Sequence, residues 1–114
     1  MDTKKEVQNH SIDVAKEFSQ FPAGRYTGDG SYSGEAFRER HLRFALDTGA
    51  VIIIEIDGGE GYGSSFLEEA FGGLVRHGYY SATELHDRLK FRSADDSLVE
   101  EVWRYIDKAK PSNR

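Results

Sequence analysis

The sequence contains no cysteine, and only two prolines, one methionine and one tryptophan among its 114 residues. Without cysteine, disulfides, thiolate metal sites and cysteine nucleophiles are excluded. Acidic residues outnumber basic ones, 20 against 15, and the resulting formal net charge of -5 argues against the basic surface that binds nucleic acid. The longest fully apolar run, residues 50–54, is far too short to cross a bilayer. We therefore expect a cytoplasmic protein that binds no nucleic acid and no membrane.

The composition is that of an ordinary folded domain, with 38% hydrophobic and 31% charged residues. The chain is long enough to bury most of its apolar surface in one core. We expect a single domain over residues 11–110, after a flexible N-terminus at 1–10 and before a polar tail at 111–114. The four histidines are not spaced as metal pairs, and no motif predicts a cofactor. His41, on an apolar stripe, is interpreted as a core or boundary residue rather than a ligand.

The centre of the chain predicts a strand, a glycine loop and a helix. Val51–Ile54 is an unbroken run of β-branched residues, which favours a strand buried on both faces. After the glycine loop, Ser64 and Ser65 precede an amphipathic helix that ends at His77-Gly78. In open α/β sheets, ligands and partners meet the loops at the carboxyl ends of the strands. This loop is therefore the first place to look for function.

The remaining segments also alternate between predicted strands and predicted helices. Before the central strand we expect a first strand within 11–18, with a frayed helical turn as the alternative, then a long loop at 21–34 and a helix at 34–47 that is capped by Ser33 and ended by Gly49. After the central helix we expect a short helix capped by Thr83 and a third strand at 90–93. The last helix begins at Asp95-Asp96-Ser97 and stops before Pro111. This order predicts an α/β fold with a small, mostly parallel or mixed sheet and helices packed on it.

Enzyme chemistry finds little support in the sequence. The loop at 58–65 has the glycine spacing of a phosphate-binding loop but no lysine, and it lacks the third glycine of a dinucleotide fingerprint. Neither Ser64 nor Ser65 lies in a nucleophile elbow. Glu68-Glu69 and Glu100-Glu101 are interpreted as solvated faces, because adjacent helix residues do not face each other. We expect a protein that is not an enzyme.

Several residues around the glycine loop are candidates for binding. If the first two strands are parallel neighbours, Arg25 and Asp29 lie near Ser64, or Arg25 instead pairs with Asp29 or Asp57 to order the loops. Ser64 is either a phosphate acceptor at a helix N-terminus or simply the helix cap.

The pair Gly72-Gly73 lies inside the predicted helix, at a cost of about 1 kcal/mol per glycine relative to alanine. Two interpretations remain open: close packing on the sheet, or a flat patch that faces a partner.

Three segments resemble the bacterial STAS-like domain of unknown function family: Phe21–Arg25, Ser33–Arg38 and Glu60–Leu74. The resemblance implies the fold of anti-sigma factor antagonist domains, whose strand-to-helix loop reads Asp-Ser-Ser-Gly with the first serine phosphorylated by a partner kinase. Ser64 falls on that serine, while Gly63 and Phe66 replace the flanking aspartate and glycine. In this comparison Asp57 supplies the acid from earlier in a longer loop.

The resemblance implies a non-enzymatic regulator that binds a protein partner, a histidine-kinase-type ATPase. In this hypothesis Ser64 or Ser65 is phosphorylated, and Tyr62, Gly63, Gly72 and Gly73 belong to the contact surface. The alternative hypothesis is a module that binds a small molecule or nucleotide, with Arg25 and the glycine loop as an anion cradle.

Overall fold

The computed structural model describes residues 9–57 and 61–112. Three parallel strands form one sheet with β2 in the middle, and they are β1 (Asn9–Asp13), β2 (Val51–Glu55) and β3 (Leu89–Arg92). Ile54 of β2 is aligned with Ile12 on one side and Phe91 on the other. The predicted α/β class with a parallel sheet is confirmed.

Two helices connect the strands, and each contains one π-helical turn, which is wider than an α-helical turn. The first crossover helix runs through α2 (Gly34–Phe37), η2 (Arg38–Leu42) and α3 (Arg43–Leu46), and the second through α4 (Ser64–Leu67), η3 (Glu68–Gly72) and α5 (Gly73–Arg76). The other helical segments are α1 (Val14–Glu17), the 3-10 turn η1 (Thr27–Asp29), α6 (Ala82–Arg88) and α7 (Asp96–Lys108). No helix within the described residues is long and apolar enough to cross a membrane.

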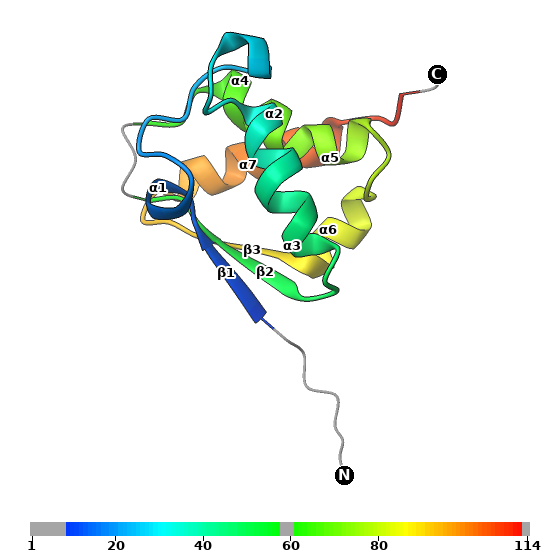
Figure 1. Cartoon of the computed structure of the whole chain (residues 1–114). Helices are drawn as coiled ribbons and strands as arrows, with labels where there is room; N and C mark the ends of the chain where they lie inside the picture. The colour runs from blue at the N-terminus through cyan, green and yellow to red at the C-terminus, as the bar shows by residue number, and fades with distance from the viewer. Residues whose placement is uncertain (1–8, 58–60, 113–114) are drawn as a thin grey trace.

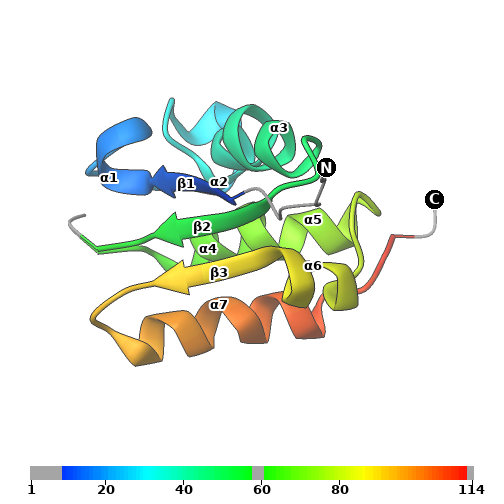
Figure 2. The same cartoon turned by 90° about the horizontal axis from the view of Figure 1, so that it is seen from below.

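The helices gather on one face of the sheet, and the views along and across the sheet agree on this (Figures 1 and 2). Alternate side chains of β2 point into the core, so Ile52 and Ile54 are fully buried while Val51 and Ile53 are only partly so. The prediction that this strand is buried on both faces is therefore wrong. A run of β-branched residues is compatible with either arrangement, and no described helix covers the second face.

Two local boundaries differ from the sequence prediction. The first strand ends at Asp13, because the Asp13 carboxylate accepts a hydrogen bond from the Lys16 backbone N–H at 3.2 Å and caps α1. Val14 thus belongs to a helical turn. Ser81 caps α6 in place of the predicted Thr83, since Ser81 and Glu84 bond each other's backbone N–H in a capping box at 3.0 and 2.7 Å.

Other expectations are confirmed by specific contacts. The Ser33 hydroxyl accepts a hydrogen bond from the Ala36 N–H at 3.1 Å, and Gly49 has a φ of 89°, the left-handed conformation expected after a helix. His41 lies at the edge of the core, with ring centroids 5.3 Å from Phe18 and 5.6 Å from Phe37. Burial lowers the pKa of His41, against an opposing effect of Glu17.

The two crossover helices approach most closely at Gly34. A Cβ atom at this position would lie 2.5 Å from the Phe66 carbonyl oxygen and 3.0 Å from the Ala70 nitrogen. Both are backbone atoms of the second crossover helix, which cannot move aside as a side chain end can. Only glycine permits this helix contact.

We expect Gly34→Ala to lower the free energy of unfolding by about 1 to 3 kcal/mol, because the added methyl group forces the two helices apart. Urea denaturation measures the difference. Gly28→Ala is the matched control, since a Cβ atom there meets nothing within 4 Å. Equal stability of the two variants would contradict the close approach.

Candidate functional site

The start of the second crossover helix presents two hydroxyl groups to solvent. Ser64 and Ser65 are its first two residues, and both are exposed. The next two residues, Phe66 and Leu67, are buried in the core. The serines therefore lie on a turn that the core holds in place.

Gly63 is the N-cap of this helix, with extended backbone angles and no side chain to bond the first turn. The alternative that Ser64 serves as the helix cap is therefore wrong. A serine can cap only from the residue before the first helical turn, and Ser64 already lies inside that turn. Its side chain instead hydrogen-bonds Tyr105 of α7.

Arg25 lies against the same helix, one turn beyond the serines. Its Nη1 donates to Oε1 of Glu68 and, at 3.2 Å, to Oε1 of Glu69. Arg25 thus lies near this helix, as predicted. The alternative prediction, that the Arg25 side chain pairs with Asp29 or Asp57, is wrong. Asp29 accepts a hydrogen bond from the backbone N–H of Arg25 and not from its guanidinium group, and Asp57 accepts hydrogen bonds from Ser93 and Ala94.

Asp29 and Asp57 each order a loop. Asp29 accepts hydrogen bonds from the backbone N–H groups of Arg25 and Tyr26, at 3.2 and 2.9 Å, and so holds the turn η1. Asp57 accepts from the Ser93 hydroxyl and the Ala94 N–H, both at 3.0 Å. It therefore joins the segments that follow β2 and β3.

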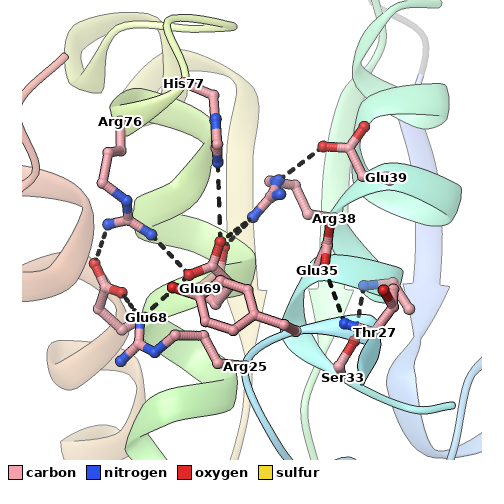
Figure 3. A network of polar contacts seen from close by, with 12 residues as sticks. Arg25, Thr27, Ser33, Glu35, Arg38, Glu39, Glu68, Glu69, Arg76 and His77 are labelled. Atoms are coloured by element: carbon pink, nitrogen blue, oxygen red, sulfur yellow. Dashed lines mark hydrogen bonds and ion pairs between the residues drawn. The ribbon is translucent and has the colours of Figure 1, made fainter. Parts of the chain in front are cut away.

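Behind Arg25 lies a buried ion pair between the two crossover helices (Figure 3). The side chains of Arg38 and Glu69 are each only 3% exposed. Nη1 of Arg38 donates to Oε2 of Glu69 at 2.8 Å and to its backbone carbonyl at 2.7 Å. Arg76 adds a bond to Oε1 of Glu69 at 3.0 Å, so every oxygen of this buried residue has a donor. A buried charge needs such complete pairing.

The prediction that Glu68-Glu69 forms a solvated face is wrong. Glu69 is buried, and Glu68 is partly buried between Arg25 and Arg76. The rule that adjacent helix residues diverge holds for regular α-helices. Here the Gly73 N–H bonds the Glu68 carbonyl five residues back, and this wider turn reduces the angle between successive side chains. Both carboxylates can then reach the same arginines.

The glycine pair closes the network. Gly72 and Gly73 are buried, so the interpretation that they form a patch facing a partner is wrong. A Cβ atom on Gly73 would collide with the Arg38 guanidinium, and one on Gly72 would lie 2.8 Å from Oε2 of Glu68 and 3.3 Å from the Tyr105 carbonyl oxygen of α7. The other interpretation, that the glycines allow close packing, is correct. The neighbours are the ion network and α7, however, and not the sheet.

A cavity of about 340 Å³ opens at the carboxyl ends of β2 and β3, between the glycine loop and the start of α7. Its lining residues are Ile56, Asp57, Gly61, Tyr62, Ser93, Asp95, Ser97, Leu98 and Glu101. They include three carboxylates and neither lysine nor arginine, and Arg25 lies elsewhere. The charge of this cavity does not suit the anion cradle proposed for the glycine loop, whose residues 58–60 lie outside the described ones.

Tyr62 reaches into the same region with a buried hydroxyl that has no hydrogen-bond partner among the described residues. Burial raises the pKa of Tyr62, with further contributions from the charges of Asp13 and Asp57. Across residues 9–57 and 61–112, no three His, Asp or Glu side chains are grouped so that they could hold a metal ion.

Comparison with known proteins places this arrangement in a family. The family model described as STAS-like domain of unknown function (DUF4325) matches residues 33–98, more than half of the chain. The chain belongs to this STAS-like family. Searches of curated proteins and of solved structures returned no match. In the STAS-like domain, the matched residues include both serines, both glutamates of the network and Arg38, whereas Arg25 lies before them.

We expect Glu69→Gln to destabilise the STAS-like domain by about 3 kcal/mol or more, because the change leaves three guanidinium groups around a buried position without its charge. Urea denaturation provides the measurement. Glu39→Gln is the control: Glu39 also bonds Arg38, but its side chain is 33% exposed, so the loss should stay within about 1 kcal/mol. Similar losses for both variants would show that burial of the pair is unimportant.

Glu68 should make the domain sensitive to acid. Burial alone would raise the pKa of Glu68, but hydrogen bonds from Arg76 and Arg25 outweigh it and lower the pKa. A lowered folded-state pKa contributes stability above the unfolded value of about 4.3, and this contribution is lost as the pH falls through the folded value. The fall in unfolding free energy between pH 6 and 3 should therefore be shallower in Glu68→Gln than in the unchanged domain. An unchanged slope would speak against the ion pairs.

Proposed function

We propose that this STAS-like domain is a non-enzymatic regulator that binds a protein partner, and that phosphorylation at the start of the second crossover helix controls the contact. The observation that carries the proposal is the state of the two serines. Ser64 and Ser65 are exposed on a rigid first turn, and Gly63 takes the capping position from them. Their hydroxyls are thus accessible to a kinase without unfolding of the helix.

The helix terminus suits the modification. A phosphoserine carries nearly two negative charges at neutral pH, and a helix N-terminus carries partial positive charge on its unbonded N–H groups. Because Gly63 has no side chain to bond these groups, a phosphate here meets no competing cap. The charge added to the surface is large enough to decide whether a partner binds.

A surface for a partner lies beside this turn. The loop between α1 and α2 exposes Phe21, Tyr26 and Tyr32 by 66%, 53% and 50%. Arg25, in the same loop, bonds the helix one turn after the serines, so the aromatic side chains are held near the modification site. Aromatic residues are enriched in protein interfaces and dominate their binding energy. The partner proposed is a histidine-kinase-type ATPase, in line with the family resemblance.

The test is recovery of the partner from the native host. The tagged domain should co-purify with a kinase-type ATPase and should carry phosphate on Ser64 or Ser65, as shown by peptide mass spectrometry. The double variant Ser64→Glu/Ser65→Glu should reduce recovery of the partner by about tenfold or more, a change of roughly 1.4 kcal/mol in binding.

Ser11→Glu provides the control, because Ser11 is an exposed serine of β1 and lies neither on the helix nor in the aromatic loop. Recovery should remain as with the unchanged domain. The proposal is overturned if no protein partner is recovered, or if both the double variant and the control reduce binding equally.

A further inference from the structure

Arg25 uses only part of its hydrogen-bonding capacity. Both of its side-chain bonds, to Glu68 and to Glu69, come from the single nitrogen Nη1. Nε and Nη2 have no hydrogen-bond partner within the described part of the chain. These two nitrogens form one edge of the planar guanidinium group, and such an edge binds two oxygens of a phosphate at once. The side chain as a whole is 32% exposed.

The network around Arg25 carries more positive than negative charge. Three guanidinium groups, those of Arg25, Arg38 and Arg76, surround the two carboxylates of Glu68 and Glu69. The count remains one positive charge in excess when the outer pair of Glu39 and Arg43 is included. An additional anion next to Arg25 is therefore balanced by charge that is already present.

The helix places Ser65, and not Ser64, on the side of Arg25. Ser65 precedes Glu68 and Glu69 by three and four residues, and residues at this spacing share a helix face. Ser64 has this spacing to Glu68 alone, and its side chain hydrogen-bonds Tyr105 of α7 instead. In Figure 3, Arg25 approaches the two carboxylates from the end at which the helix begins, whereas Arg76 and His77 approach from the other end.

We propose that Ser65 is the phosphorylated residue and that the Nε/Nη2 edge of Arg25 binds its phosphate. The inference rests on the proposed function. In the modification, the Ser65 hydroxyl oxygen forms a bond to the γ-phosphorus of the ATP on the partner kinase, the hydroxyl proton is released and ADP leaves. The phosphate then lies one turn before the carboxylates that Nη1 already contacts.

This arrangement would couple the modification to the partner surface. Arg25 lies between Phe21 and Tyr26 in the sequence of the aromatic loop. With Nη1 on the carboxylates and the other edge on the phosphate, Arg25 fastens the loop to the helix at two points in place of one. Phosphorylation thus restricts the Arg25 part of the loop and fixes the aromatic side chains against the partner, in line with the weaker binding expected for Ser64→Glu/Ser65→Glu.

The experiment installs phosphoserine directly, by suppression of a stop codon at position 65 or 64 in the full chain, so that no kinase is needed. Phosphoserine at 65 should raise the Tm by roughly 4 °C, and this gain should disappear in Arg25→Gln. A phosphorus NMR titration should show the second phosphate pKa, ordinarily about 6, lowered by about half a unit or more relative to Arg25→Gln. Glu68 and Glu69, one turn after the phosphate, are present in both proteins, so the difference reports on Arg25.

Two variants separate geometry from charge. Arg25→Lys keeps the positive charge but has no flat edge, so it should retain only part of the change in Tm and pKa. Arg40→Gln, which removes an exposed arginine from the first crossover helix, should retain all of it. Comparison of each variant with and without phosphate removes any effect of the substitution on folding itself.

The inference is overturned if the phosphate at 65 titrates identically with and without Arg25, or if phosphate at 64 depends on Arg25 to the same extent. Such a result leaves the proposed function standing, with another receptor for the phosphate. Conversely, if the protein from the host carries no phosphate and binds no partner, the proposed function is overturned. That result does not affect the measurement of how Arg25 responds to an installed phosphoserine.

Discussion

The buried pair of Arg38 and Glu69 is the interaction on which the rest of this structure depends. It joins the two crossover helices, and transfer of both charges from water costs several kcal/mol per ion unless the pairing is complete. Complete pairing requires that the two crossover helices approach closely. Gly73 allows this approach because it leaves room for the Arg38 guanidinium group. The cost of two glycines inside a helix is thereby offset, since alanine at either position would push an ion-pair partner away.

The same constraint explains why the start of the second crossover helix is rigid although it is exposed. Glu69 is anchored to the first crossover helix, and Phe66 and Leu67 are buried one turn earlier. Gly34 packs directly on this turn. Ser64 and Ser65 thus precede residues that are held by the core, the ion pair and the contact with Gly34, and a modified side chain there would act from a well-defined position.

Local sequence patterns predict most of the fold but not the arrangement of the site. Hydrophobic periodicity located the crossover helices, and Ser33 and Gly49 marked ends of the first, because these signals depend on neighbours in the chain. The capping box at Ser81 and Glu84 was also readable, yet Thr83 was preferred. Burial of Glu69, by contrast, depends on an arginine 31 residues away, and the regular helical spacing used for prediction does not include the wide turn that lets Glu68 join it.

The ion network has an inner and an outer part that differ in strength. Arg38 and Glu69 are almost fully buried, and loss of either charge would cost a large share of a stability that is typically 5 to 15 kcal/mol. Arg25 is a third exposed, and ion pairs at that exposure contribute about 1 kcal/mol or less. The backbone N–H groups of Gly34 and Glu35 donate to the carbonyls of Gly24 and Arg25, so the loop is already held on the first crossover helix and the Arg25 side chain is a further contact that can change without loss of the fold. A contact of this strength would suit the proposed regulation, because one phosphate beside Arg25 would contribute about as much as the present ion pairs of Arg25 do.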